Sequence, residues 1–592
     1  MTSPAPAPPL STPWWSAATR WDRLVLLLVL VLGWLWIWGA CWNPWRVSCF
    51  LQPTGHGDPV QHYLGWHVYA FSTPVRLIPP LFDQWTWPHP LPLLYADVIP
   101  LAAVVLRPLQ RLVGQPFQYF SVLSLLNILA TGLLGHRIGW EATGSRGAAF
   151  ALGLALGLAP PMVMRTFAHE ALSLQVLIVL ALALLIRRES RFWPWALLLA
   201  LAPGVHGYFM ALLFPLVAVR LLSSEFAPSA LADGWRGWCL RRWGWSPPAR
   251  VLDALSLGLV LAVMVWLVGY TSGDVERSPD WGENWSANLL AFLDSNNSSP
   301  IVPPLGRHMP YQIEGFAYLG LFVILAAPLV RLFWGRRRPR AATLFPSPAL
   351  FWGLLALMVV FAWGPRWYAG PQALLDLGVL KRLPLTSTAF LSFRATGRFL
   401  WPAYYALTIW TIVHLWTLFR AAWWPKLVFV VFLLSLWESH SIPLQAAHHH
   451  FQHRQAALPA GTDPVPAALV DVARRPGSLL INVTDNPRAA PRTLPSFALQ
   501  RLAPGVTTNH APYLARYPRV SQAAAGATSC ERMGNVLREH PEIRERVWFV
   551  VEGEDSERCR PLPGWTVERL LDLSPRKWVA RPIPQSGAGG RP

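Results

Sequence analysis

Long apolar runs recur along this sequence and limit the folds open to it more than any other feature. Three of them are LVLLLVLVLGWLWIWGA at 24–40, ALSLQVLIVLALALLI at 171–186 and VLDALSLGLVLAVMVWLVGY at 251–270. Their lengths are close to the roughly 17–25 residues that cross a bilayer core. Charged residues make up 14% of the chain, whereas a soluble domain carries about a quarter. The sequence therefore predicts a polytopic membrane protein.

The first apolar run has the length of a signal peptide, but no small-residue cleavage site follows it, so we expect a retained helix. The expected fold class is mainly α, a membrane helical bundle of about 10–12 spans with a small C-terminal extracytoplasmic α/β domain. The expected spans are 24–40, 117–135, 147–164, 171–186, 193–203, 206–222, 251–270, 315–333, 348–363, 399–418 and 424–438.

Between the apolar runs, polar and proline-rich segments predict the domain organisation. We expect a disordered tail at 1–20, a transmembrane domain at 21–440 and a soluble domain at 441–592, in which SLLINVT and RVWFVVEG are strand-like. Proline interrupts the segment 97–114, which is predicted to be a juxtamembrane or re-entrant helix. Three long outer loops are expected at 41–94, 271–314 and 365–397.

The net charge of +19 comes from arginine clusters beside apolar runs, such as IRRESR and GRRRPR. This is the distribution of the positive-inside rule, so we expect these clusters in the cytoplasm and no nucleic-acid partner. The resulting topology places the C-terminal domain outside the cytoplasm. It also places the five cysteines in a consistent way, with the pairs Cys41–Cys49 and Cys530–Cys559 in the oxidising compartment and Cys239 alone inside. The spacing of the five cysteines does not prove these bonds, and their positions can also arise by chance.

Residues suited to chemistry gather on the outer face of the predicted bundle. Carboxylates beside imidazoles suit general acid/base catalysis, and paired arginines suit a phosphate. Each also has a structural interpretation: Asp58, His169 or Glu170 can cap a helix, and the arginines can reach lipid headgroups. The histidine-rich segment 447–453 is interpreted as a polar linker. The outer-face residues are Asp58, His62, Asp97, His169, Glu170, Arg394 and Arg398.

Several common catalytic motifs are missing from the sequence. It contains no glycine-rich nucleotide loop, no CxxC zinc pair, no HExxH and no GxSxG. The sequence therefore contains no motif that would support a reaction on soluble nucleotides or a hydrolase activity.

The layout of one helix, a large outer loop with an acid near its start, a short amphipathic helix and then paired spans resembles the GT-C superfamily of membrane glycosyltransferases. More narrowly, the chain resembles a bacterial family of GT-C type described as a domain of unknown function. That similarity runs from about residue 25 to about residue 520 and rests on GDPVQHYLGW, YADVIPL, FQYF, APPMVMRTFAHEAL, IEGFAYLG, FRATGRFLWPAYY and NHAPYLARY.

The resemblance implies a donor sugar on a polyprenyl phosphate, an extracytoplasmic acceptor and a location in the bacterial inner membrane among its lipids. It places the general base on Asp58, with Asp97, His169 or Glu170 as a second group. Many superfamily members carry two adjacent acids where this chain has GDP, so a base acting alone is favoured, and a divalent metal at Asp58 stays open. The implied substrate-binding residues are Gln61, Tyr63, Glu314, Arg394 and Arg398.

Two other functions fit the same residues. A lipid-linked sugar flippase would need a similar cavity and similar arginines, although no inverted hydropathy repeat is visible. A non-catalytic lipid-binding protein of envelope assembly is the third alternative.

The topology can be tested by thiol labelling. We expect Asp58, His169, residues 271–314 and the chain after 440 outside, and residues 223–250 inside. An Asp233→Cys variant should react with an impermeant maleimide only after the membrane is permeabilised, whereas Asp280→Cys should react in intact cells. Labelling of Asp233→Cys from outside would refute the order of the spans.

Overall fold

The structure is a computed structural model that describes most of the chain in two compact units. One unit comprises residues 1–42, 119–264 and 277–451, and the other comprises 43–118, 265–276 and 452–592. The described residues are 17–50, 58–71, 77–82, 91–166, 169–227, 229–243, 248–272, 284–337, 343–379, 393–418, 424–456, 479–482, 507–508, 529–545, 547–552, 565–569 and 577–582.

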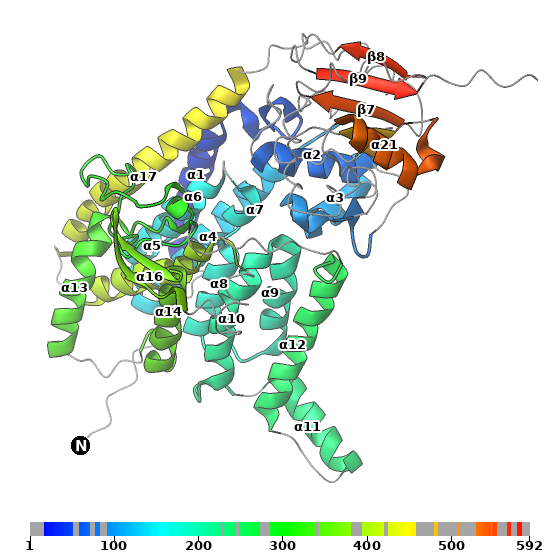
Figure 1. Cartoon of the computed structure of the whole chain (residues 1–592). Coiled ribbons are helices and arrows are strands. Elements are labelled where there is room, and N and C mark those ends of the chain that lie inside the picture. The colour runs from blue at the N-terminus through cyan, green and yellow to red at the C-terminus, as the bar shows by residue number, and fades with distance from the viewer. Residues whose placement is uncertain are drawn as a thin grey trace, which may run out of the picture. The chain divides into compact units, whose positions relative to one another are not determined.

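The first unit is a bundle of apolar helices (Figure 1), which confirms the predicted helical membrane fold. Within the described residues, five helices are long and apolar enough to cross a membrane, and five shorter apolar helices accompany them. Its main helices are α1 (Ala17–Trp38), α4 (Phe120–Thr143), α5 (Arg146–Gly157), α6 (Pro160–Thr166), α7 (Glu170–Ser173), α8 (Val176–Ile186), α9 (Phe192–Val205), α10 (Gly207–Leu222), α11 (Ala230–Trp243), α12 (Ala249–Val268), α13 (Gly320–Arg337), α14 (Pro348–Ala362), α16 (Trp401–Leu418) and α17 (Trp424–Ala456).

Several expected spans differ from the observed helices in length, as α4 does by continuing past residue 135 to Thr143. The span expected at 315–333 begins only at Gly320, where the backbone has a φ of +77° that suits glycine. The span expected at 424–438 continues to Ala456 as α17, so the segment 447–453 is helical and the linker interpretation is wrong. His448 helps to hold it, because its ring stacks on Trp36 with the centroids 4.3 Å apart.

The span expected at 171–186 is broken into α7 and α8. Two buried polar side chains bind the backbone at the break. Gln175 donates from Nε2 to the carbonyl of Leu172 at 3.4 Å. Gln175 accepts a hydrogen bond from the Tyr405 hydroxyl at 2.8 Å. Asn127 donates to the carbonyl of Ser173 at 2.9 Å and accepts from the amide of Val176 at 3.0 Å. Irregular backbone persists at membrane depth only where protein groups satisfy it, and these side chains provide that satisfaction.

Helices α4 and α5 pack with their backbones almost in contact. A Cβ atom at Gly135 would lie 2.6 Å from the carbonyl oxygen of Leu152, and one at Gly139 would lie 2.7 Å from the Cα of Ala149. Small residues at such crossings are typical of membrane helices, which gain little from the hydrophobic effect and associate through close packing.

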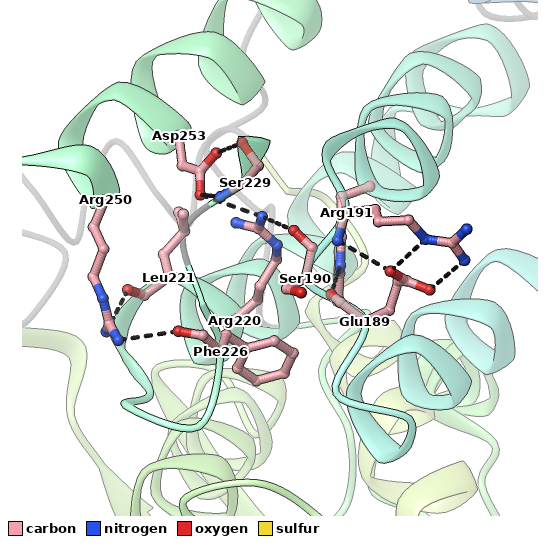
Figure 2. Close-up of polar contacts among 10 residues, drawn as sticks. Glu189, Ser190, Arg191, Arg220, Leu221, Phe226, Ser229, Arg250 and Asp253 are labelled. Atoms are coloured by element: carbon pink, nitrogen blue, oxygen red, sulfur yellow. Dashed lines mark hydrogen bonds and ion pairs between the residues drawn. The ribbon is translucent and has the colours of Figure 1, made fainter. Parts of the chain in front are cut away.

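A second polar cluster joins α10, α12 and the loop before α11 (Figure 2). Asp253 forms a buried ion pair with Arg220 at 3.3 Å and accepts hydrogen bonds from the amide and the hydroxyl of Ser229. Arg250 donates to the carbonyls of Leu221 and Phe226 at 3.2 and 3.3 Å. Separating the partners of such a pair would leave a buried charge without compensation, which is costly. The pair therefore holds the loop before α11 in one arrangement.

The second unit contains α2 (Asp58–Phe71), the 3-10 helix η3 (Leu93–Ala96), α3 (Pro100–Val113) and a short hairpin of β1 (Leu81–Phe82) and β2 (Leu91–Pro92). Helix α3 is amphipathic. Arg107 is buried and donates to the carbonyl of Tyr69 at 2.9 Å, whereas Val105 and Leu112 are 65% and 84% exposed. An apolar face of this kind suits a helix lying in the membrane interface, as the juxtamembrane prediction requires.

The C-terminal strands of this unit form a five-stranded mixed sheet in the order β6-β5-β7-β9-β8. The strands are β5 (Leu479–Asn482), β6 (Thr507–Thr508), β7 (Val547–Glu552), β8 (Trp565–Arg569) and β9 (Lys577–Pro582), and α21 (Ser529–Glu539) accompanies them. β5 runs parallel to β6 and β7, whereas β9 is antiparallel to β7 and β8. The two strand-like pieces expected from sequence are confirmed as β5 and β7.

The α4–α5 contact predicts a clear difference between two glycines. Gly139→Ala should lower the free energy of unfolding by about 1–3 kcal/mol, because the added methyl group meets backbone that cannot move aside. Gly258→Ala on α12 is the control, since its Cβ would meet nothing within 4 Å. Thermal unfolding in detergent measures both. Equal melting temperatures would contradict the packing described.

Candidate functional site

Asp58 is the first residue of α2 and is half-buried. A carboxylate in the first turn is stabilised by the helix dipole, so the capping interpretation and the catalytic one are both compatible with this position. His62 lies one turn further on and is fully buried. Gln61 donates a long hydrogen bond of 3.5 Å to the carbonyl of Tyr95. The start of α2 thus contacts the segment just before Asp97.

His62 and Asp97 face each other, with Nε2 and Oδ2 3.9 Å apart. Asp97 ends η3 in the left-handed conformation, with a φ of 52°. Two donor atoms bound to one divalent ion at about 2.1 Å each lie no more than about 4.2 Å apart, so this pair fits two ligands of a metal ion. A complete site needs further donors, and Asp58 on the same helix is the candidate from sequence.

Tyr63 lies in the core of this unit. It is fully buried, with its ring centroid 5.9 Å from Phe50 and 5.8 Å from His67.

In the first unit, Glu314 binds two arginines with one carboxylate oxygen. Its Oε2 lies 2.9 Å from Nη1 of Arg165, and 3.0 Å and 2.7 Å from Nε and Nη2 of Arg398. All three residues are buried, with exposed fractions of 6–8%. Burial raises the pKa of Glu314, but the charges of Arg165 and Arg398 outweigh this and hold that pKa well below its usual range. The two guanidiniums and the one carboxylate together carry a net charge of +1.

A close approach of two glycines positions this cluster. Glu314 belongs to the 3-10 helix η4 (Pro310–Gly315) and Arg398 to η6 (Thr396–Leu400). A Cβ atom at Gly397 would lie 2.8 Å from the Cα of Gly315, so both positions need glycine for η4 and η6 to meet. The guanidinium of Arg398 also covers the ring of Tyr208, 4.4 Å from its centroid.

His169 and Glu170 lie beside this cluster in the chain that follows α6. His169 is at the N-cap position of α7 but its side chain makes no capping hydrogen bond, so the capping interpretation of His169 is wrong. Its charge is among the influences that lower the pKa of Glu314. Glu170 is buried in the first turn of α7.

Arg394 takes part in an aromatic stack. Its Cζ lies 3.7 Å from the centroid of the Trp285 ring, and Trp285 stacks on Tyr311 with a centroid distance of 4.2 Å and an interplanar angle of 14°. Arg394 and Arg398, four residues apart, thus have different surroundings.

The structure brings His62 and Asp97 together in one unit, and Glu314 and Arg398 together in the other. Arg394 lies instead on Trp285. Sequence reasoning missed Arg165, although it lies in the motif APPMVMRTFAHEAL. An arginine directly after an apolar run is costly unless it is paired, and this was the available signal.

The cysteines are only partly described. Cys41 and Cys49 are both disulfide-bonded, as their predicted pairing requires, and Cys239 is a buried free thiol. Cys559 and the side chain of Cys530 lie outside the described residues, so that pairing stays a prediction.

Three solved structures are similar to this chain. ArnT from Cupriavidus metallidurans bound to undecaprenyl phosphate is 14% identical, with a TM-score of 0.44 over 97% of this chain and 100% of that chain. The apo state of that ArnT is 15% identical, with a TM-score of 0.43 over 95% and 98%. The apo oligosaccharyltransferase from Archaeoglobus fulgidus is 10% identical, with a TM-score of 0.38 over 91% and 70%.

A comparison with curated proteins finds no match. A family model described as "Domain of unknown function (DUF6311)" matches residues 25–439, which is most of the chain. The chain therefore belongs to the DUF6311 family.

Proposed function

We propose that this protein is an integral membrane glycosyltransferase of GT-C type, which moves a sugar from a polyprenyl-phosphate donor to an extracytoplasmic acceptor. The observation that carries the proposal is the buried cluster of Arg165, Glu314 and Arg398, whose net positive charge suits a phosphate. The resemblance of the GDPVQHYLGW and FRATGRF motifs to the GT-C pattern supports it.

In the proposed reaction, the acceptor hydroxyl attacks C1 of the donor sugar. The bond between C1 and the phosphate oxygen breaks, and the lipid phosphate leaves with the bonding electrons. Asp58 takes the hydroxyl proton. Carboxylates act in this way in glycosyl transfer, where the sugar passes through an oxocarbenium-like transition state.

The arginines stabilise the leaving phosphate. Charge develops on that group as the C1–O bond breaks, and preorganised donors in a buried site stabilise it without reorganising. Glu314 keeps both guanidiniums oriented, because it binds each of them through one oxygen. Its low pKa keeps it ionised through the neutral range, so the positions of the arginines do not depend on pH there.

Other residues have supporting roles in the proposal. Asp97 with His62, or Glu170, supplies the second catalytic group, and a divalent ion held by His62 and Asp97 would orient the donor. Gln61 positions the start of α2 through Tyr95. The protein acts in the bacterial inner membrane, with its C-terminal domain outside the cytoplasm.

Replacing the proposed base separates catalysis from folding. Asp58→Asn should lower sugar transfer by about 10²–10⁴-fold, because an amide cannot take a proton, while stability changes little, since Asn caps helices about as well as Asp. The assay measures transfer from a panel of undecaprenyl-phosphate-linked sugars in proteoliposomes, with melting temperature in detergent alongside.

The control is Asp376→Asn, which alters an exposed acid paired with Arg366. Normal transfer by a folded Asp58→Asn protein would remove Asp58 from the mechanism and move the base to Glu170. Movement of the intact lipid-linked sugar across the bilayer without transfer would favour the flippase.

Replacing arginine by lysine tests the phosphate role. Arg398→Lys should weaken binding of undecaprenyl phosphate about tenfold, because lysine keeps the charge but loses the planar fork of donors. Native mass spectrometry of the detergent-solubilised protein measures the affinity. The control is Arg366→Lys, in the hairpin of β3 (Arg366–Ala369) and β4 (Gln372–Asp376), where Arg366 pairs with Asp376. Arg394→Lys is compared in the same way. Unchanged affinity in both the Arg394 and Arg398 variants would favour anchoring to lipid headgroups instead.

A further inference from the structure

We propose that Glu314 makes the site select the intact donor over the polyprenyl phosphate that remains after transfer, so that this product leaves. The inference rests on the proposed function, in which Arg165 and Arg398 bind the phosphate of the lipid. A carboxylate between these arginines is itself a negative neighbour for that phosphate. Like charges repel each other, and the repulsion grows with the charge of the ligand.

Glu314 binds the same guanidiniums that would hold the phosphate. Its Oε2 lies 2.9 Å from Nη1 of Arg165 and 2.7 Å from Nη2 of Arg398. Aromatic rings flank both groups, with Cζ of Arg398 4.4 Å from the Tyr208 centroid and Cζ of Arg165 5.9 Å from the Trp401 centroid. Guanidinium donors point outward in the plane of the group. A phosphate bound to these donors therefore lies close to the carboxylate.

The backbone on both sides of Glu314 is held in place. Arg165 donates from Nη2 to the carbonyl of Ile313 at 3.2 Å. On the other side, a Cβ atom at Gly397 would lie 2.8 Å from the Cα of Gly315, so these two segments are in direct contact. The Glu314 side chain is 10% exposed, and little water is present to screen its charge. The carboxylate therefore stays beside any phosphate that the arginines bind.

The charge of the lipid changes during the proposed reaction. The donor is a phosphodiester with one negative charge. When the sugar moves to the acceptor and the acceptor proton moves to Asp58, the lipid is left as a phosphomonoester. The second pKa of such a group is about 6, so its charge approaches about −2 above neutral pH.

The charge of the cluster matches the donor and not the product. Two guanidiniums, the Glu314 carboxylate and the phosphodiester sum to zero, whereas the phosphomonoester brings the sum to about −1. An unbalanced charge in a buried site is costly. The site should therefore bind the phosphodiester in preference to the more highly charged product.

Two arginines without the carboxylate would have the opposite preference. Their combined charge would favour the phosphomonoester, and tight binding of the product would slow its release, which limits turnover in many enzymes. The ion pairs of Glu314 also stabilise both buried arginines before a donor binds. Glu314 is thus a specificity-determining residue that discriminates between donor and product.

The binding of two matched lipids measures this selection. The probes are undecaprenyl phosphate, a phosphomonoester, and its methyl ester, a phosphodiester. Each is titrated into the full-length detergent-solubilised protein at pH 8 and followed by native mass spectrometry. The wild type should bind the methyl ester at least as tightly as the phosphomonoester. Glu314→Gln removes the charge and keeps the size of the side chain, so it should shift the ratio of the two affinities about tenfold towards the phosphomonoester.

The matched control is Asp253→Asn, which neutralises another buried carboxylate paired with an arginine, Arg220. It should leave the ratio of the two affinities unchanged. Arg165→Gln keeps the pair of Arg398 with Glu314 and should shift the ratio about tenfold towards the methyl ester. This variant tests the charge balance even if Glu314→Gln does not fold. Combining Arg165→Gln with Glu314→Gln restores the net charge and should restore the wild-type ratio.

An unchanged ratio in the folded Glu314→Gln or Arg165→Gln protein would overturn the proposal. So would a wild type that binds the phosphomonoester about tenfold more tightly than the methyl ester, or that binds neither lipid. The readout does not depend on catalysis. A ratio that follows the charge at position 314 in a protein without sugar transfer counts against the glycosyltransferase alone. Sugar transfer with a ratio that ignores this charge counts against the selection alone.

Discussion

The ion pairs of the buried Glu314 carboxylate are the interaction on which the arrangement of α6, η4 and η6 depends. Through one oxygen it holds Arg165 at the end of α6 and Arg398 in η6, directly before α16. Three segments that are far apart in the sequence therefore meet at one atom. An isolated charge at this depth would cost many kcal/mol, so each arginine is stable there only while the carboxylate is present.

The need to satisfy buried polar groups also explains the irregular backbone of the bundle. Helices α7 and α8 are separate because Asn127 and Gln175 bind backbone groups that a continuous helix would have satisfied by itself. Tyr405 in turn holds Gln175 in place, since its hydroxyl donates to the Gln175 side chain.

Composition and periodicity were sufficient to predict the helical membrane fold, because the bilayer sets a length and a polarity that can be read directly from the residues. They were not sufficient to predict where the helices end and where they are interrupted. The interruption at Gln175 depends on Asn127, 48 positions away, and the true length of α17 depends on a contact between His448 and Trp36. The pairing of Arg398 with Glu314 could not be predicted either, because nothing in the local sequence FRATGRF distinguishes Arg398 from Arg394.

The length of α17 has a mechanical consequence. Its 33 residues span about 50 Å at 1.5 Å per residue, well beyond a bilayer core of about 30 Å. Inserting one residue ahead of His448 would rotate every later side chain by about 100° and carry that ring away from Trp36. Inserting about seven residues, close to two full turns, would restore the direction of that ring but move it about 10 Å along the helix axis. The contact with Trp36 therefore fixes how many residues of α17 can precede His448.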